Sequence, residues 1–302
     1  MRIIVNGQQA FGRAVLEALL ERGENVVAVY TAPDGDGPPD PLKAAAVERG
    51  LPLLQPRSFR RESVREGMRE FAPDLCVMAY VTLFVPEATL NVPTRGTIQY
   101  HPSLLPMHKG PSAINWPIIF GETVTGLSIF WPDDGLDTGP ILLQREVAIG
   151  PDDTVGSIYF DHLFPLGVTA MLDAVDQVRA GTAPKIAQDP NAGSYESWCR
   201  ADDAKIDWKK PTQDVYNLIR GANPQPGAWT MLGEDRLQLF DCRPSDAEGD
   251  PGAIVATGAA SFTVATADGG IEVLRVRPAG AGKMPAGEFL SSSGLVVGQR
   301  FA

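Results

Sequence analysis

The first third of the sequence alternates short apolar runs with amphipathic segments, and this alternation constrains the fold more than any other feature. Residues 3–5, 26–30 and 75–79 have the length and apolar character of buried strands, whereas residues 11–20 and 42–49 repeat apolar side chains at helical spacing. Strands that alternate with helices pair in parallel, in a sheet that helices cover on both faces. We therefore expect an α/β domain with a mostly parallel, Rossmann-like sheet.

The C-terminal third has a different pattern. A turn-rich stretch at residues 190–194 precedes it, and residues 211–220 carry one further helical pattern. Short strand-like runs divided by Gly, Asp and Pro follow at residues 237–240, 253–256, 261–266 and 270–276. Such runs are typical of a small antiparallel barrel. We expect the α/β domain to occupy residues 1–203 and an OB-like β-barrel domain to occupy residues 204–302.

The charge balance bears on the choice of partner. The chain carries 26 Lys and Arg against 37 Asp and Glu, a formal net charge of −11. An acidic surface repels the phosphate backbone of nucleic acids unless a basic patch overrides it. The densest basic segment, residues 57–69, interleaves arginine with glutamate at the spacing of a salt-bridged, solvated helix face. The sequence thus argues against nucleic acid as a partner, and it leaves the oligomeric state open.

Cysteine usage and the N-terminus indicate the compartment. Cys76, Cys199 and Cys242 are few and far apart, which argues against a disulfide framework or a zinc knuckle and favours a reducing environment. Residues 1–5 run directly into a strand-like segment rather than a signal peptide, and we find no apolar run of membrane-spanning length. We expect a cytoplasmic protein that does not enter the membrane.

The first strand-to-helix turn, residues 7–12, reads Gly-Gln-Gln-Ala-Phe-Gly. It lacks the close glycine triplet that lets a dinucleotide pyrophosphate approach the backbone, and no Gly-Lys-Ser/Thr follows it to form a phosphate loop. We interpret Gly7 as a tight turn and expect no NAD.

His101 is the histidine whose position is most informative. It follows the apolar residues 96–98 and precedes Pro102, and the residue before a proline is held in an extended conformation. His101 therefore belongs at a strand exit, where open α/β sheets bind their ligands. That position suits a catalytic and a structural histidine equally well. His108 and His162 have no His or Cys at ligand spacing, so we expect no metal site.

The loop after the apolar run 126–130 contains three carboxylates. Asp133 and Asp134 flank a turn and are most simply solvated turn formers. Asp137 follows the apolar Leu136 and precedes a Thr-Gly turn, so its side chain could point inward. Partial burial makes a carboxylate a better proton acceptor near neutral pH. On spacing alone this signal is weak.

Several motifs together resemble the folate-dependent formyltransferase family. They are His-Pro-Ser-Leu-Leu-Pro at 101–106, Gly110, Ala-Ile-Asn-Trp at 113–116 and Leu-Asp-Thr-Gly at 136–139. The family includes glycinamide ribonucleotide, methionyl-tRNA and amino-sugar formyltransferases and the N-terminal hydrolase domain of 10-formyltetrahydrofolate dehydrogenase. The likeness is greatest to that hydrolase domain, through residues 4–8, 30–34, 100–103, 128–131, 151–155 and 163–165. Residues 205–208, 219–221 and 226–230 resemble the family's C-terminal domain, so the resemblance covers essentially the whole chain.

The resemblance implies a formyltransferase fold, 10-formyltetrahydrofolate as formyl donor, and neither metal nor NAD. It also implies that His101 and Asp137 are the catalytic pair. Gln99 stands where most members have an Asn whose amide helps hold the formyl oxygen, and the hydrolase domain itself departs from Asn there. Gln carries the same amide on a longer stem, so it could stabilise an oxyanion in the same way.

The resemblance further implies where the pterin ring binds. One wall would be the loop that follows residues 75–79, and the other would be the loop before Asp137. An apolar wall with backbone donors suits a flat heteroaromatic ring. The implied binding residues are Ala79, Tyr80, Val81, Leu83, Phe84, Val85, Pro132, Asp133, Asp134 and Gly135.

Three functions remain open from the sequence. The first is hydrolysis of 10-formyltetrahydrofolate to tetrahydrofolate and formate. The second is formyl transfer to an amino sugar or another amino compound, with methionyl-tRNA disfavoured by the net charge of −11. The third is a non-catalytic folate-binding module, which requires His101 and Asp137 to lie too far apart to share a ligand.

Overall fold

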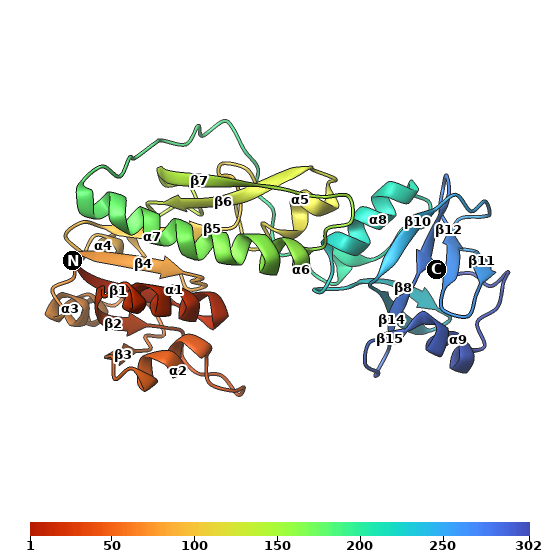
Figure 1. Cartoon of the computed structure of the whole chain (residues 1–302), viewed down its shortest axis with the longest axis horizontal. Helices are drawn as coiled ribbons and strands as arrows, with labels where there is room; N and C mark the ends of the chain where they lie inside the picture. Colours follow the sequence, from red (N-terminus) through yellow and green to blue (C-terminus); the bar gives the residue numbers. More distant parts are fainter. The chain divides into compact units, whose positions relative to one another are not determined.

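The computed structural model describes residues 1–302 and contains two compact units (Figure 1). The first comprises Met1–Gly110, Gly126–Val147 and His162–Tyr195. The second comprises Pro111–Thr125, Ala148–Asp161 and Glu196–Ala302. The units are not continuous in sequence, so a domain boundary between residues 203 and 204 stays a prediction.

The first unit is built on a seven-stranded sheet in the order β3-β2-β1-β4-β5-β6-β7. The strands are β1 (Arg2–Gly7), β2 (Asn25–Tyr30), β3 (Leu53–Leu54), β4 (Leu75–Ala79), β5 (Thr97–His101), β6 (Val124–Phe130) and β7 (Ile141–Ala148). Strands β1 to β5 pair in parallel, which confirms the predicted sheet. Strand β6 runs antiparallel to β5 and places Phe130 opposite Gln99. The sequence analysis missed β3, because two residues are too short for a periodic pattern.

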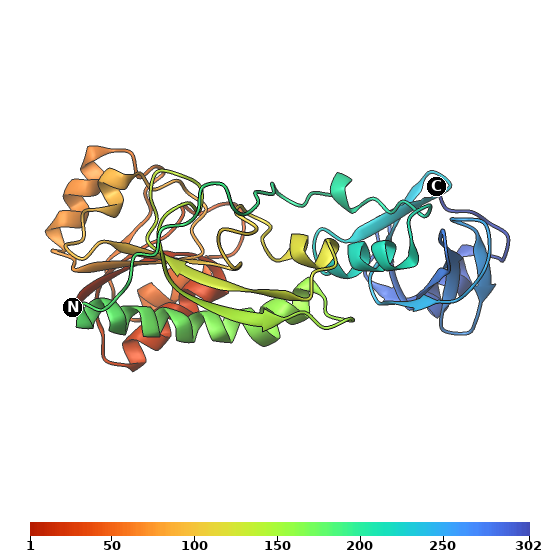
Figure 2. The ribbon, with the colours of Figure 1, turned by 90° about the horizontal axis from the view of Figure 1, so that it is seen from above.

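Helices cover both faces of this sheet. They are α1 (Gln9–Glu21), α2 (Pro41–Glu48), α3 (Glu62–Glu70), α4 (Glu87–Leu90) and α7 (Phe164–Ala180). Seen from above, α3 and α4 lie on one face and α1 and α7 on the other (Figure 2). On the second face the ring centre of Phe11 lies 4.3 Å from that of Tyr100, in a tilted contact, and 5.5 Å from that of Phe164, in an edge-to-face contact. Gly167 permits this packing, because a Cβ there would lie 2.7 Å from the Tyr100 ring.

The basic segment around α3 forms ion pairs on its surface. Arg65 and Arg69 of α3 both pair with Glu62, which confirms the predicted salt-bridged face.

One helical run is long and apolar enough, by length and composition alone, to cross a membrane, namely Val155–Ala180. The prediction that no apolar run has this length is therefore wrong. Core helices of soluble proteins meet the same test. One side of α7 is buried against α1 and β5, through Ala170, Met171 and Ala174 among others.

The second unit consists mainly of two four-stranded sheets, ordered β10-β13-β12-β11 and β15-β14-β9-β8. All assigned strand pairs in them are antiparallel, as predicted, whereas the OB-like description stays a prediction. The strands are β8 (Ala228–Leu232), β9 (Asp235–Leu239), β10 (Cys242–Ser245), β11 (Ile254–Thr257), β12 (Phe262–Ala265), β13 (Gly270–Val273), β14 (Arg275–Pro278) and β15 (Met284–Pro285). The helices are α5 (Asn115–Ile119), α6 (Val155–Ser157), α8 (Thr212–Gly221) and α9 (Ala286–Ser293). The predicted single strand over 270–276 is two strands, because the chain changes sheets at Leu274.

The carboxyl edge of the first sheet is held by a very close approach of two strands. β1 ends at Gly7 and β4 ends at Ala79, and the carbonyl oxygen of Ala79 accepts a hydrogen bond from the amide of Gln8 at 3.2 Å. A Cβ on Gly7 would lie 2.2 Å from that oxygen. The tight turn expected at Gly7 is therefore a packing requirement of this edge.

We predict that Gly7→Ala lowers the free energy of unfolding by about 2 kcal/mol or more, because strands β1 and β4 must separate to admit the methyl group. The control is Gly67→Ala in α3, where nothing lies within 4 Å of the added Cβ. This control should stabilise the protein by about 0.5–1 kcal/mol. Urea unfolding midpoints measure both changes, and equal midpoints would contradict the prediction.

Candidate active site

His101 is the last residue of β5 and is only 5% exposed. Its Nε2 lies 2.9 Å from the carbonyl oxygen of His108. A carbonyl can only accept a hydrogen bond, so Nε2 must carry a proton. The turn that brings His108 back to His101 is closed by the hydroxyl of Ser103, which donates to the carbonyl of Met107. His101 thus presents Nδ1, rather than Nε2, to the rest of the site.

Asp137 lies in the loop between β6 and β7 and is 7% exposed, so the expected inward orientation is confirmed. Its φ of +56° lies in the left-handed region, which is uncommon for a residue with a side chain. Its Oδ2 accepts a hydrogen bond from the backbone amide of Gly110 at 2.9 Å and lies 3.6 Å from Nδ1 of His101. The loop after β5 and the loop after β6 therefore meet at this carboxylate.

The pairing of Nδ1 with Oδ2 has a direct chemical consequence. With Nε2 protonated, a neutral His101 would direct the lone pair of Nδ1 at the carboxylate of Asp137. A single proton on either group converts that repulsion into attraction. At 3.6 Å the two atoms are beyond direct hydrogen-bond distance, which leaves both able to contact a third group. The two side chains can thus act as hydrogen-bond partners of one bound ligand.

The remaining carboxylates of the loop fix its shape. Oδ1 of Asp133 accepts hydrogen bonds from the amide of Gly135 at 3.0 Å and from the hydroxyl of Thr138 at 2.7 Å. Oδ1 of Asp134 accepts from the amide of Glu87 at 2.7 Å and thereby joins this loop to the start of α4. The bonds of Asp133 agree with its predicted role as a turn former, whereas Asp134 bonds outside its own turn.

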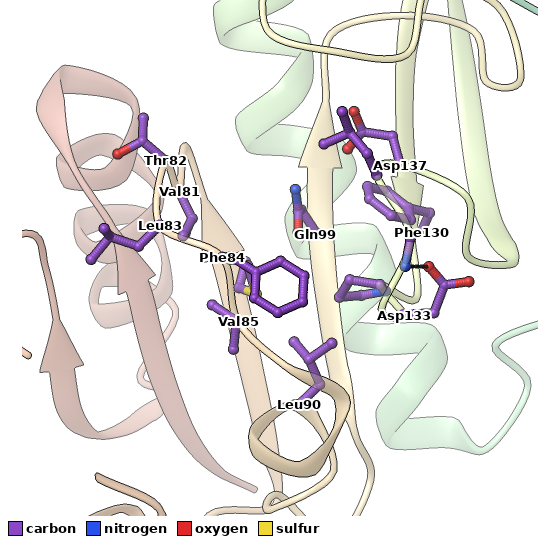
Figure 3. Close-up of a pocket in the computed structure, with 14 residues that line it drawn as sticks. Val81, Thr82, Leu83, Phe84, Val85, Leu90, Gln99, Phe130, Asp133 and Asp137 are labelled. Atoms are coloured by element: carbon purple, nitrogen blue, oxygen red, sulfur yellow. Dashed lines mark hydrogen bonds between the residues drawn. The ribbon is translucent and has the colours of Figure 1, made fainter. Parts of the chain in front are cut away.

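A cavity of about 180 Å³ lies beside Asp137. One wall is the segment Val81–Val85 after β4, and the opposite wall is formed by Pro132, Asp133, Gly135, Leu136 and Asp137. Figure 3 shows Gln99, on β5, between the two walls. Met78, Leu90 and Phe130 complete the lining. The sequence analysis missed them, because Met78 and Phe130 sit in ordinary apolar runs and Leu90 lies in the four-residue helix α4, which carries no motif.

Three residues of the predicted binding set do not line this cavity. Ala79 is fully buried, and its carbonyl faces Gly7 and Gln8. Tyr80 has a φ of +63° and is 46% exposed. Asp134 is engaged at the start of α4. His101 also lies outside the lining and reaches the cavity through Asp137.

Gln188 is a further contributor that no sequence motif indicated. Its Nε2 donates to the carbonyl oxygens of Asp137, at 2.9 Å, and Gly139, at 2.8 Å. Within residues 1–302 no cluster of three or more His, Cys, Asp or Glu side chains is arranged to hold a metal ion.

Two family profiles match most of the chain. The family profile described as Formyl transferase matches residues 1–174, and the profile of the formyl transferase C-terminal domain matches residues 199–294. The chain is 43% identical over 245 residues to the cytosolic 10-formyltetrahydrofolate dehydrogenase of Xenopus tropicalis, a match that covers 80% of this chain and 27% of that protein. The match thus spans about a quarter of that relative.

A second relative matches from end to end. The methionyl-tRNA formyltransferase of Geotalea daltonii is 36% identical over 306 residues, which cover 99% of this chain and 98% of that protein. Among solved structures, HypX from Aquifex aeolicus in complex with tetrahydrofolic acid has a TM-score of 0.69 at 20% identity and covers 96% of this chain and 47% of that chain. WlaRD, a sugar 3N-formyl transferase, also has a TM-score of 0.69, at 16% identity, and covers 93% of this chain and 98% of that one. These two structures share the fold, and the sequence matches show that the protein belongs to the formyl transferase family.

Proposed function

We propose that this chain hydrolyses 10-formyltetrahydrofolate to tetrahydrofolate and formate in the cytoplasm. The observation that carries the proposal is the 3.6 Å approach of Nδ1 of His101 to Oδ2 of Asp137, a residue that lines the same cavity as Gln99. The 43% identity to a cytosolic 10-formyltetrahydrofolate dehydrogenase supports the same donor and compartment. The short distance argues against a non-catalytic binding module, which required the two side chains to lie apart.

The lining of the cavity suits the pterin ring of the donor. Val81, Leu83 and Val85 supply apolar surface from one loop, and Phe130 and Pro132 supply it from the other side. Flat heteroaromatic ligands bind between apolar walls of this kind, with a few polar groups that set their orientation. The cavity adjoins Asp137, so a ring seated there places its N10 substituent near the catalytic pair.

In the mechanism that follows, Asp137 accepts a proton from water as the water oxygen bonds to the formyl carbon. The protonated imidazole of His101 donates from Nδ1 to the formyl oxygen and stabilises the tetrahedral intermediate, because Nε2 is already committed to His108. The bond from carbon to N10 then breaks, and the proton held by Asp137 passes to N10. Tetrahydrofolate and formic acid leave, and the acid ionises to formate.

Gln99 is suited to assist the formyl oxygen. Residues two apart on a strand project to the same face, so Gln99 and His101 share one face of β5. The amide of Gln99 has donors that require no ionisation. A second donor at the developing oxyanion is worth on the order of 3 kcal/mol of barrier in other acyl-transfer enzymes.

Formyl transfer to an amine is the second candidate, favoured by the end-to-end match to a methionyl-tRNA formyltransferase. The same pair would serve it, with an amine in place of water. The two are separated by incubating the protein with 10-formyltetrahydrofolate alone and then with a panel of amino sugars, amino acids and methionyl-tRNA. Turnover without an acceptor supports hydrolysis, acceptor-dependent turnover supports transfer, and binding without turnover would refute both.

We predict that His101→Gln and Asp137→Asn each lower kcat by about 10³-fold, because each removes a proton donor or acceptor from the reaction. The melting temperature and the affinity for tetrahydrofolate should change little, since both replacements keep the side chain's approximate shape. Release of tetrahydrofolate is followed by absorbance, with Asp173→Asn, an exposed carboxylate on α7, as the control. Near-normal turnover by either variant would contradict the assignment.

Gln99 gives a separate prediction. Gln99→Leu should lower kcat by roughly 10²-fold with a smaller change in KM, because the lost donor acts on the oxyanion rather than on the bound ring. Gln99→Asn should recover part of this loss, since it restores the amide on a shorter stem. Steady-state kinetics measure both, and equal kcat in all three proteins would show that Gln99 is not such a donor.

A further inference from the structure

The segment Pro184–Gln188, which follows α7, is attached to both ends of the Asp137 loop. Ile186 forms two backbone hydrogen bonds with Ile141, at 2.8 and 2.9 Å, where β7 begins. The indole nitrogen of Trp131, where β6 ends, donates to the carbonyl of Pro184 at 2.9 Å. These contacts fix the backbone of the segment on either side of the loop, so the position of Gln188 is set independently of its own side chain.

The side-chain amide of Gln188 spans the tip of this loop. Its nitrogen donates to the carbonyls of Asp137 and Gly139, so both of its protons are used. The backbone at Gly139 lies directly against the carbonyl of Trp131, since a Cβ on Gly139 would be 1.8 Å from that oxygen. The loop therefore cannot shift further toward Trp131. Gln188 therefore holds the peptide that follows Asp137 and the peptide that follows Gly139.

The backbone at Asp137 needs such support. Left-handed φ values cost a residue with a side chain on the order of 1 kcal/mol and persist only when surrounding contacts impose them. The φ of +56° directs the carboxylate toward the amide of Gly110 and the imidazole of His101. Relaxation of this strain would move the carboxylate away from both partners.

Stability alone does not account for the side chain at this position. The Oε1 atom of Gln188 is buried and has no hydrogen-bond partner within the chain. A buried acceptor without a partner is destabilising, so this side chain is not explained by the stability that it contributes. What the chain gains here is the pair of hydrogen bonds from the amide nitrogen.

We propose that Gln188 is a positioning residue that holds the carboxylate of Asp137 in register with Gly110 and His101. Its part in turnover rests on the proposed function, whereas its part in placing the carboxylate does not. Gln188 lies between the two stretches matched by the family profiles, residues 1–174 and 199–294, so neither profile covers it.

The test compares Gln188→Leu with Gln238→Leu in the full chain. Gln238 is a matched control, because its amide nitrogen also donates to two backbone carbonyls, those of Pro226 and Gly227, in the other unit. The first readout is the hydrogen-exchange rate of the Gly110 amide, measured by NMR, since that amide donates to Asp137 Oδ2. We expect Gln188→Leu to accelerate this exchange by roughly tenfold or more and Gln238→Leu to leave it unchanged.

Kinetics supply the second readout. Gln188→Leu should lower kcat at least tenfold while KM for 10-formyltetrahydrofolate stays within about threefold, because Gln188 does not itself line the cavity. Gln188→Glu retains the shape but can donate only when its carboxyl is protonated. Its activity relative to the unaltered protein should therefore rise as the pH falls.

The outcomes are separable. Unchanged Gly110 exchange in Gln188→Leu overturns the positioning role, whether or not the protein turns over folate. Accelerated exchange with kcat and KM unchanged refutes the role in catalysis. Absence of turnover by the unaltered protein refutes the proposed function, and the exchange measurement still decides whether Gln188 places the carboxylate.

Discussion

The hydrogen bond from the backbone amide of Gly110 to the carboxylate of Asp137 connects the two loops on which the site depends. The loop after β5 contains Gly110, and the loop after β6 contains Asp137. β5 and β6 run antiparallel, and Phe130, the last residue of β6, pairs with Gln99 of β5, so the loop that contains Asp137 begins beside β5. A carboxylate that accepts a backbone amide is held in one orientation, so His101 meets a fixed oxygen rather than a mobile side chain.

Strand β5 shows how the core and the site share one short element. Gln99 and His101 face the cavity side, and Tyr100 between them packs against Phe11 on the opposite face. Contacts of Phe11 with Phe164 extend this packing to α7. Alternation along the strand thus couples the position of the reactive groups to the densest part of the core.

Much of the fold could be predicted from local patterns. The apolar runs at 3–5, 26–30 and 75–79 indicated parallel strands because they alternate with helical segments. The two-residue β3 and the change of sheet at Leu274 could not be predicted, because both depend on contacts between distant segments. His101 and Asp137 were identified mainly through family motifs, since spacing alone left each of them ambiguous.

The contacts of Gln188 with the Asp137 loop could not be predicted from the sequence for a related reason. A glutamine that bonds to backbone carbonyls carries no periodic or motif signal, and Gln188 reaches residues about fifty positions earlier in the chain. The left-handed backbone at Asp137 was equally invisible, because an aspartate followed by threonine gives no reason to expect it. Both features depend on contacts between distant segments, which the local sequence does not indicate.

The bond between Nε2 of His101 and the carbonyl of His108 has a consequence for how protons travel. An imidazole with both nitrogens open can take up a proton on one side and release it on the other, as a relay. Here Nε2 is hydrogen-bonded to the carbonyl of His108, so Nδ1 is the nitrogen that faces a ligand. In the proposed reaction, a proton that His101 gives to the substrate therefore has to return through Nδ1.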